Sequence, residues 1–341
     1  PSLGCSSGCH RRRRVEVVFL SSVCVLVTGA SGFVGAALVE RLASEPDTRV
    51  LAAGRRVFPV AAGVEHRLLG DLGEACYAPV QFQDVDVVVH TAARVHVMRD
   101  TSLEPLTEYR RVNVEGTLAL ARAAAAAGVR RFVFLSSIKV NGEESRAGIP
   151  FSADDLPAPK DAYGISKLEA ERALRSLAAA TGMEVVIVRP PLVYGPGVGA
   201  NFRSLMRWLQ RGVPLPLGGI SNKRSLVALP NLVDLLAVCI AHPAAANQVF
   251  LAGDGVDMST SELLRRLGLA LGCPARLISL PAVCMRVLLL SLGMERIWLR
   301  LWGDLQVDIG KTCRLLDWRP PVPVDVALRE AAQSFQQDGS C

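Results

Sequence analysis

Tyr163 and Lys167 stand four residues apart in the segment DAYGISKLEA, a spacing that puts both side chains on one face of a helix. A tyrosine hydroxyl titrates near ~10, so lowering its pKa to about 7 requires a preference of ~4 kcal/mol for the phenolate. A lysine ammonium ~4 Å away supplies about that much at an effective dielectric constant of about 20. Ser137 can donate a hydrogen bond to the same substrate oxygen. These three residues are therefore candidates to move a proton at a carbinol oxygen while hydride is transferred.

A glycine-rich turn lies near the start of the chain. Val23–Val27 is an apolar run that predicts a buried parallel strand, and TGASGFVG at 28–35 leads from it into a predicted helix. Gly29 permits a sharp turn, Gly32 lets the backbone approach a pyrophosphate, and Gly35 lets the helix pack closely on the sheet. The free N–H groups of the helix then hold the phosphates. This arrangement predicts a dinucleotide site.

The second predicted strand, Arg49–Ala53, is followed by Gly54, Arg55 and Arg56. In a dinucleotide-binding fold an acidic residue at this strand end takes the 2′-hydroxyl of NAD, whereas an arginine accommodates the 2′-phosphate of NADP. No Asp or Glu occurs between residues 49 and 64. The sequence therefore favours NADP, with NAD possible. The alternative is that the two arginines only cap the strand.

Further apolar runs predict strands at 66–72, 86–90, 131–135, 183–189 and 249–252, and helices at 109–127, 163–180, 201–210 and 259–271. The alternation predicts an α/β fold, a Rossmann-type doubly wound parallel sheet with a smaller C-terminal α/β substrate lobe. We expect the sheet domain at 22–190, with 225–252 returning to it. The substrate lobe is expected at 191–224 and 253–335. Residues 1–21 are expected to be a disordered or non-native tail, and 336–341 a second tail.

Two buried polar residues are expected to be structural: His90 at a strand end, and Asn113, which could bridge backbone segments or order a water. The nine cysteines include no C-x-x-C pair and are read as small buried hydrophobes of a reducing compartment, which predicts a cytoplasmic protein. No metal site and no nucleic-acid surface is expected, and Arg11–Arg14 is interpreted as a solvated tail. The apolar run at 287–294 is far short of the ~20 residues of a membrane span. Residues 280–302 are therefore expected to be an amphipathic helix over the core, and contact with a membrane surface stays open.

Seven motifs resemble those of extended short-chain dehydrogenases/reductases, in the NAD-dependent epimerase/dehydratase family that acts on nucleotide sugars. They are TGASGFVG at 28–35, GDL at 70–72, HTAA at 90–93, NVEGT at 113–117, SS at 136–137, YGISK at 163–167 and RPPLVYGPG at 189–197. The resemblance covers roughly residues 23–329. Within the family, the chain is most similar to the UDP-glucose 4-epimerase-like proteins of bacterial surface-polysaccharide pathways.

The resemblance implies roles for individual residues. The catalytic residues would be Ser137, Tyr163 and Lys167, and Lys167 would also hold the nicotinamide ribose. The cofactor would contact Gly29, Ser31, Gly32, Phe33, Val34, Gly35, Arg55, Arg56, Asp71, Leu72, Thr91, Ala92, Ala93, Asn113, Tyr163, Lys167 and Pro190. The UDP-sugar substrate would contact Ser137, Asn201, Phe202 and Arg224, with Arg224 clamping the diphosphate. A homodimer through the helices at Tyr109 and Asp161 is also implied.

Sugar dehydratases of this family carry an Asp-Glu pair after the serine or threonine, and here Ile138 and Lys139 stand there, which argues against dehydration. The favoured function is NADPH-dependent reduction of a UDP-linked 4-keto deoxy sugar, because the arginines after the second strand suit NADPH. The alternative is a 4-epimerase of UDP-glucose or UDP-N-acetylglucosamine with tightly bound NAD. Two further possibilities are a dehydrogenase of a 3-hydroxysteroid-type alcohol and a non-catalytic NADP-sensing binding protein.

Overall fold

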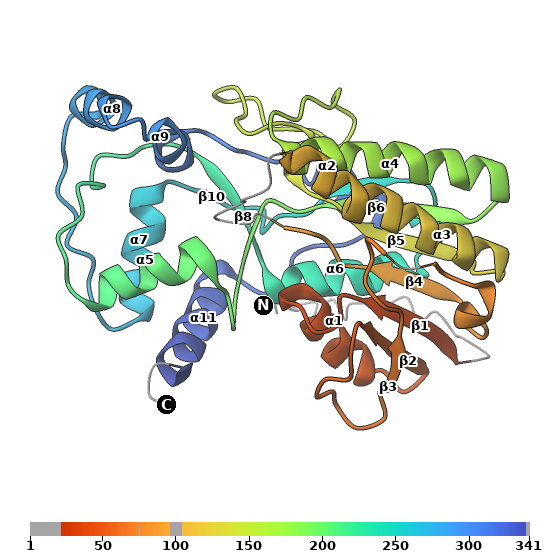
Figure 1. Ribbon diagram of the computed structural model, residues 1–341. Helices are drawn as coiled ribbons and strands as arrows, with labels where there is room; N and C mark the ends of the chain where they lie inside the picture. The colour runs from red at the N-terminus through yellow and green to blue at the C-terminus, as the bar shows by residue number, and fades with distance from the viewer. Residues whose placement is uncertain (1–21, 75, 96–103, 339–341) are drawn as a thin grey trace, which may run out of the picture.

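The computed structural model describes residues 22–74, 76–95 and 104–338 (Figure 1). Its centre is a parallel seven-stranded sheet in the order β3-β2-β1-β4-β5-β6-β9. The strands are β1 (Val23–Thr28), β2 (Thr48–Gly54), β3 (Glu65–Leu68), β4 (Val87–His90), β5 (Arg131–Leu135), β6 (Glu184–Arg189) and β9 (Val249–Leu251). The chain runs outward from β1 to β3 and then crosses to β4 on the other side of β1. This reversal is the topological switch point, beside which such folds bind ligands. The predicted Rossmann-type fold is confirmed.

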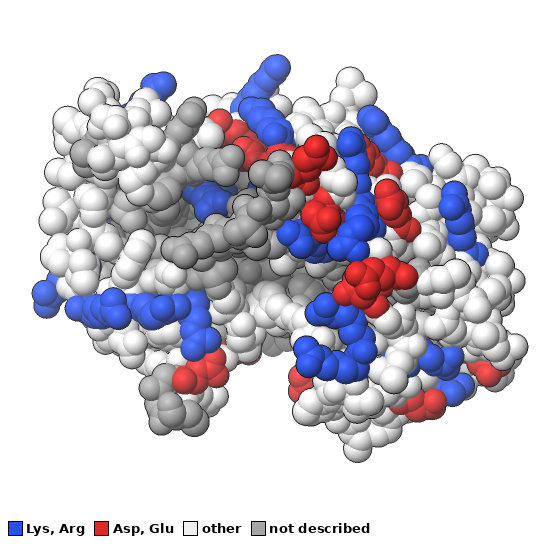
Figure 2. Space-filling view, in the orientation of Figure 1, with Lys and Arg blue, Asp and Glu red and all other residues white. Residues whose placement is uncertain are grey.

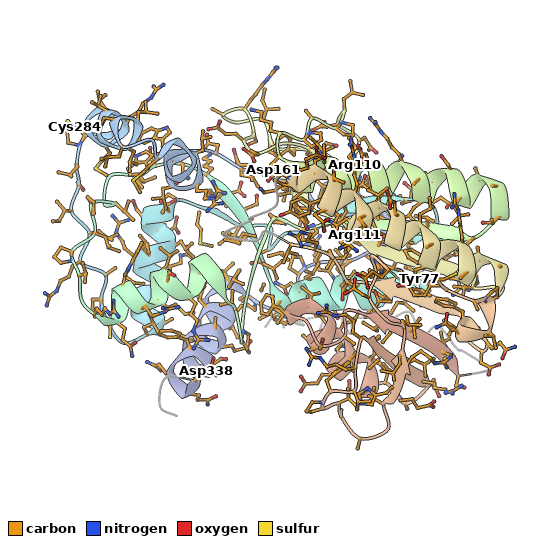
Figure 3. The ribbon with its side chains drawn as sticks, in the orientation of Figure 1. Tyr77, Arg110, Arg111, Asp161, Cys284 and Asp338 are labelled. Atoms are coloured by element: carbon orange, nitrogen blue, oxygen red, sulfur yellow. The ribbon has the colours of Figure 1, made fainter. Side chains whose placement is uncertain are left out.

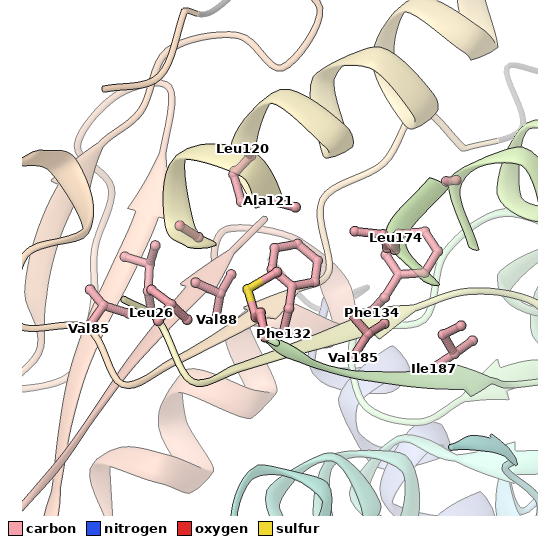
Figure 4. Close-up of a cluster of buried hydrophobic side chains, with 14 of the residues drawn as sticks. Leu26, Val85, Val88, Leu120, Ala121, Phe132, Phe134, Leu174, Val185 and Ile187 are labelled. Atoms are coloured by element: carbon pink, nitrogen blue, oxygen red, sulfur yellow. The ribbon is translucent and has the colours of Figure 1, made fainter. Parts of the chain in front are cut away.

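Helices cover both faces of this sheet (Figure 1). One face carries α1 (Phe33–Ala43) and α6 (Leu229–Ala241), and the other carries α3 (Thr117–Ala126) and α4 (Ala162–Thr181). Strand side chains alternate between the two cores: Leu26 packs on the α3 and α4 side, whereas Val25 and Val27 pack on the α1 and α6 side. Figure 4 shows Phe132 and Phe134 of β5 beneath Leu120 and Leu174. Burial on both faces explains why these strands are continuous apolar runs.

The second lobe has its own small sheet, in the order β10-β8-β7, formed by β7 (Leu192–Tyr194), β8 (Arg224–Ala228) and β10 (Asp257–Met258). The helices of the C-terminal half outside the large sheet are α5 (Ala200–Gln210), α7 (Thr260–Ala270), α8 (Ala282–Ser291), α9 (Glu295–Trp302), α10 (Gly310–Leu316) and α11 (Val324–Asp338). A third core, around Tyr194, Phe202, Leu264 and Leu328, holds the small sheet to α5, α7 and α11. Short 3-10 turns are at Pro79–Phe82 (η1), Ile138–Val140 (η3) and Pro243–Ala245 (η4).

Three expectations differ from the structure. The helix expected at 109–127 consists of α2 (Pro105–Arg110), a π-helical segment η2 (Arg111–Gly116) and α3. The helix expected at 280–302 is divided into α8 and α9 around Gly293, whose φ is +67°. Within 225–252, α6 and β9 pack in the large sheet's layers, but β8 belongs to the small sheet. The domain boundaries remain predictions, and residues 1–21 lie outside the described part. Among the described helices, none has the length and apolarity needed to cross a bilayer.

Candidate active site

The glycine turn lies between β1 and α1, and it is closely packed. Gly29 has φ +69°, and a Cβ there would lie 2.7 Å from Ala92 N, while a Cβ at Gly35 would lie 2.2 Å from Gly29 O. The Thr91 hydroxyl donates to Thr28 O at 2.6 Å, which ties the end of β4 to the end of β1. Gly32 caps α1 without any side-chain bond to the helix N–H groups. A backbone cradle free of side chains at a helix N-terminus fits a pyrophosphate, so this turn suits the dinucleotide.

Arg55 and Asp71 lie together after β2 and β3. Arg55 Nη1 donates to Asp71 Oδ2 at 3.0 Å, and the Arg55 side chain is 70% exposed. The Asp71 carboxylate also accepts from Gly73 N at 3.0 Å. That backbone bond, and then Arg55, hold the pKa of Asp71 below its usual value. The structure thus brings together two residues that were predicted to contact the cofactor, Arg55 and Asp71. Arg56 is exposed beside them.

The remaining residues predicted to contact the cofactor follow carboxyl ends of strands, which is where this fold binds ligands. Ser31, Phe33 and Val34 follow β1, and Ser31 is exposed. Leu72 follows β3, Ala92 and Ala93 follow β4, and Pro190 follows β6. Pro190 is buried, and its carbonyl accepts from Ile138 N at 2.9 Å.

His90 is fully buried at the end of β4. One ring nitrogen is 2.7 Å from Thr28 Oγ1 and the other is 3.0 Å from Thr117 Oγ1. Burial lowers the pKa of His90 to about 3, with a smaller contribution from Lys167. A neutral ring with both nitrogens bonded agrees with the expected structural role.

Asn113 connects the turn after β4 to α4. Its side-chain oxygen accepts from Arg94 N at 2.8 Å, and its amide donates to Arg94 O at 3.1 Å and to Ser166 Oγ at 3.0 Å. Ser166 Oγ in turn donates to Tyr163 O at 2.8 Å. Asn113 lies in the π-helical segment η2. The expected bridging of backbone segments by this residue is therefore present, and it also orients the turn that carries Tyr163.

Ser137 and Tyr163 meet beyond the end of β5. Ser137 caps the η3 turn by accepting from Lys139 N at 3.3 Å. The Tyr163 ring packs edge-on against Tyr109, with ring centroids 6.0 Å apart. Burial raises the pKa of Tyr163, and a hydrogen bond with the Ser137 side chain acts in the opposite direction. The structure thus brings together the two hydroxyls that were predicted to face one substrate oxygen.

Lys167 stands one helical turn after Tyr163 in α4 and is 2% exposed. Its Nζ donates to Leu135 O at 2.9 Å and lies 4.4 Å from the centre of the Phe134 ring. Burial lowers the pKa of Lys167 to about 7, and the nearby Glu171 carboxylate opposes the shift. The charged or polar groups that act on Tyr163 are Asp161, Tyr109 and Ser137. Burial therefore outweighs any effect of Lys167 on the pKa of Tyr163 in the protein without cofactor, and the expected lowering toward 7 stays a prediction for the cofactor-bound enzyme.

Asp161 begins α4 and fixes the position of Tyr163 two residues later (Figure 3). Its Oδ1 accepts from Gly164 N at 2.7 Å, and its Oδ2 pairs with Lys139 Nζ. Lys139 therefore forms an ion pair with the N-cap residue of α4. Sequence reasoning missed this pair, although Asp161 before an apolar helix is an N-cap signal.

A buried polar cluster behind the site was also missed. Glu171 accepts from Ser136 Oγ at 2.5 Å, and it accepts two bonds from Arg189, at 2.9 and 2.5 Å. Arg189 Nη1 also donates to Asn141 Oδ1 at 2.9 Å. The cluster joins the end of β5 to α4 and β6. Glu171 stands one helical turn after Lys167, which is the only sequence signal for it.

The predicted substrate residues lie in the second lobe. Arg224 Nη1 donates to Gly303 O at 3.0 Å, and burial lowers its pKa while Glu144 and Asp304 oppose the shift. The Phe202 ring is 2% exposed and stacks on Tyr194 at 5.7 Å, so it belongs to the third core. Because the ring is packed in the core, the predicted contact of Phe202 with the substrate would use its backbone, and this contact stays a prediction. Asn201 lies in α5, and its side chain is outside the described part.

No group of His, Cys, Asp or Glu suited to a metal ion occurs among the described residues. The six cysteines in the described ranges are free: Cys24, Cys76, Cys239, Cys273, Cys284 and Cys313.

Comparisons with known proteins agree with this geometry. The chain is 48% identical over 314 residues to the UDP-glucose 4-epimerase of Vibrio cholerae, covering 92% of this chain and 95% of that protein. It is 30% identical over 334 residues to a 3 beta-hydroxysteroid dehydrogenase/Delta 5-->4-isomerase of Mycobacterium tuberculosis, covering 90% and 88%. A solved structure of MoeE5 with UDP-glucuronic acid and NAD superimposes with TM-score 0.73 at 27% identity, covering 92% of this chain and 99% of that chain. Residues 25–253 match the NAD dependent epimerase/dehydratase family. The chain therefore belongs to this family of extended short-chain dehydrogenases/reductases.

Proposed function

We propose that this protein is a UDP-hexose 4-epimerase that uses NAD and interconverts UDP-glucose with UDP-galactose, or the corresponding N-acetyl sugars. The observation that carries the proposal is the 48% identity to a UDP-glucose 4-epimerase along nearly the whole of both chains. The meeting of Ser137, Tyr163 and Lys167 at the end of β5 supports it. This proposal takes precedence over 4-keto reduction, which the sequence favoured only through Arg55 and Arg56.

The glycine turn at 28–35 would hold NAD, which would supply reversible hydride transfer at C4 of the hexose. The Tyr163 side chain, in its deprotonated phenolate form, would take the proton from the C4 hydroxyl and later give it back to the C4 oxygen. Ser137 would hold the same oxygen through its hydroxyl. Lys167, which is buried with its Nζ at the end of β5, would bind the ribose next to the nicotinamide.

The surroundings of Ser137 argue against dehydration. Eliminating water from the sugar needs a second acid and base beside C5 and C6. Ile138 is 4% exposed and apolar, and the Lys139 ammonium is paired with Asp161. Neither side chain can serve as that acid or base, so the chemistry stays at C4.

Reduction of a UDP-linked 4-keto sugar is the second candidate, and it rests on one observation. No carboxylate stands at the end of β2, and two exposed arginines follow it. Those arginines suit the 2′-phosphate of NADPH. In the structure, however, Arg55 forms an ion pair with Asp71. The Asp71 carboxylate partly neutralises the Arg55 charge, which weakens the argument for a 2′-phosphate.

The other two candidates are weaker. A 3-hydroxysteroid substrate is supported by the 30% identity to the mycobacterial dehydrogenase, but the half-buried Arg224 guanidinium suits a diphosphate better than a sterol. A non-catalytic sensor would not need the Ser137, Tyr163 and Lys167 arrangement. We also propose a homodimer through α2 and α4, where Arg110 and Glu169 form an ion pair at 2.7 Å, and light scattering after size exclusion tests it. A cytoplasmic location stays a prediction.

The decisive assay offers the purified full chain UDP-galactose with NAD, and separately UDP-4-keto-6-deoxy-N-acetylhexosamine with NADPH. Formation of UDP-glucose, followed by anion-exchange chromatography, with no NADPH consumption in the second reaction supports the epimerase. Oxidation of NADPH by the keto sugar without interconversion of the hexoses supports the reductase instead. The Tyr163→Phe variant is the control in both reactions, because it removes the hydroxyl and leaves the ring packed on Tyr109.

A further inference from the structure

Helix α8 lies at the far corner of the second lobe (Figure 1), and this helix and its flanking residues carry several exposed large apolar side chains. These residues, between 38% and 72% exposed, are named the α8 patch: Ile278, Leu280, Val283, Val287, Leu290, Leu292 and Met294. Val283, Val287 and Leu290 recur at i, i+4 and i+7, so they form one outward stripe of α8. Figure 3 places Cys284, which is also exposed, on the outer side of the same helix. Exposed apolar side chains that gather in one region often mark an interaction site, whereas single exposed apolar residues are common on any protein surface.

The α8 patch is anchored to the lobe. The segment before α8 pairs with a neighbouring loop: Leu215 N donates to Arg276 O at 2.8 Å, and Ile278 N donates to Leu215 O at 2.8 Å. From α8 itself, Met285 and Leu289 are buried one turn apart. The inner stripe of the helix therefore packs on the protein, and the outer apolar stripe is left without a protein partner among the described residues.

Along the chain, arginines outnumber carboxylates next to the α8 patch, although Glu295 directly follows Met294. Residues 263–294 contain no Asp or Glu, and they contain four arginines. Of these, Arg265, Arg276 and Arg286 are exposed. Figure 2 shows this corner as white and blue without red, in contrast with the mixed charges over the sheet domain. Apolar side chains next to exposed arginines suit a partner that combines an apolar interior with an anionic surface.

We propose that the α8 patch docks this protein onto an anionic lipid bilayer, with α8 lying in the plane of the interface. A helix of 10 residues is about 15 Å long, about half of the ~30 Å hydrocarbon thickness, so it fits along the interface and not across it. A second copy of the chain on this patch would bring two Arg286 side chains into one apolar contact, and like charges there are unfavourable. An anionic headgroup layer meets the same arginines with opposite charge.

The test is co-sedimentation of the full chain with vesicles of phosphatidylglycerol and phosphatidylcholine, compared with phosphatidylcholine alone. Binding to the anionic vesicles is expected, and it should weaken when the ionic strength is raised roughly tenfold, because salt screens the arginines. Val283→Ser with Val287→Ser should lower the partition coefficient by about tenfold or more, since two apolar side chains no longer enter the lipid. The matched control is Leu156→Ser with Ile149→Ser, which changes two apolar residues outside the patch that are 90% and 61% exposed, against 72% and 63% for Val283 and Val287.

Arg11–Arg14 could attract the same vesicles, so the measurements are repeated with all four changed to Gln. Retained binding that still depends on Val283 and Val287 supports the proposal. Absence of binding to anionic vesicles, or equal binding by the patch variant and its control, overturns it. Sedimentation velocity tests whether a second copy of the chain covers the patch instead. If the parent protein does not bind vesicles and the patch variant changes its oligomeric state, the α8 patch is a contact between protein chains and the proposal fails. Near-ultraviolet circular dichroism verifies that each variant is folded.

Discussion

Glu171 and Arg189 form a two-pronged ion pair in which the side chains are 2% and 3% exposed. The pair joins α4 to β6, and Ser136 donates to the same carboxylate from the end of β5. Lys167 is one helical turn away, and the Glu171 charge raises its pKa against the effect of burial. One buried carboxylate therefore contributes both to the packing of three elements and to the charge of Lys167.

Replacing Glu171 with Gln should lower the free energy of unfolding by about 3–5 kcal/mol, because it leaves the buried Arg189 guanidinium without its counter-charge. Urea unfolding without cofactor measures the loss. The double variant Glu171→Leu with Arg189→Met removes both charges and should be more stable than Glu171→Gln alone. A single variant as stable as the parent protein would show that the pair contributes little.

The burial of Lys167 predicts a pH dependence of stability. Its folded-state pKa is about 7, below the ordinary value of 10.5. Between these two values the unfolded chain holds a proton that the folded chain has released, so this residue makes stability rise with pH through that window. Below about pH 7 its destabilising effect is complete. Lys167→Met should therefore stabilise the cofactor-free protein most at pH 6 and should flatten the rise toward pH 10. Parallel urea titrations of the two proteins showing the same pH slope would contradict this.

Gly29 and Gly63 form a matched pair for testing the glycine turn. Both have positive φ, +69° and +85°, but a Cβ at Gly63 meets nothing within 4 Å, whereas one at Gly29 meets Ala92 N at 2.7 Å. Gly63→Ala should cost about 1–2 kcal/mol of stability and leave NAD affinity unchanged. Gly29→Ala should cost more and weaken NAD at least tenfold by calorimetry. If the two substitutions changed stability and NAD affinity equally, the glycine turn would not be part of the cofactor site.

Substitution of Arg55 and Arg56 tests whether the protein prefers NAD or NADP. If they contact the ribose 2′-position, then Arg55→Gln with Arg56→Gln should lower the affinity for NADP relative to NAD by about tenfold, because a phosphate loses two cations. Fluorescence titration with NADH and NADPH gives the ratio. An unchanged ratio of the NADP and NAD affinities would mean that neither arginine contacts the 2′-position and that Arg55 only forms its ion pair with Asp71.

Six strands of the large sheet are predictable from the sequence, because burial makes each a short, mostly apolar run. The edge strand β3, with the sequence EHRL, is exposed or half-buried, so burial does not explain its prediction. The small sheet is not predictable in this way, because β7 has three residues and β10 has two, too few for a periodic pattern. The break between α8 and α9 was missed since Gly293 lies in an otherwise helical apolar pattern.

The site residues also differ in whether the sequence predicts their positions. Motif spacing places Ser137 and Tyr163 together, because the first ends a strand and the second begins the next long helix. The partners of Lys139 and Arg189 depend on how helices lie over the sheet, which spacing does not encode. The burial that raises the pKa of Tyr163 in the protein without cofactor could not be predicted, because burial is a property of the fold and the sequence displays only the nearby lysine.

The central claim is that hydride leaves C4 and returns to the same carbon while Tyr163 handles the proton. The most direct measurement incubates the full chain and NAD with UDP-glucose carrying deuterium at C4, and analyses the UDP-galactose by mass spectrometry and proton NMR. The account predicts that the deuterium stays on C4 of the product, with no net NADH formed, and that Tyr163→Phe slows the reaction by about 10²–10⁴-fold. Loss of the deuterium from C4, or full activity of Tyr163→Phe, would contradict it.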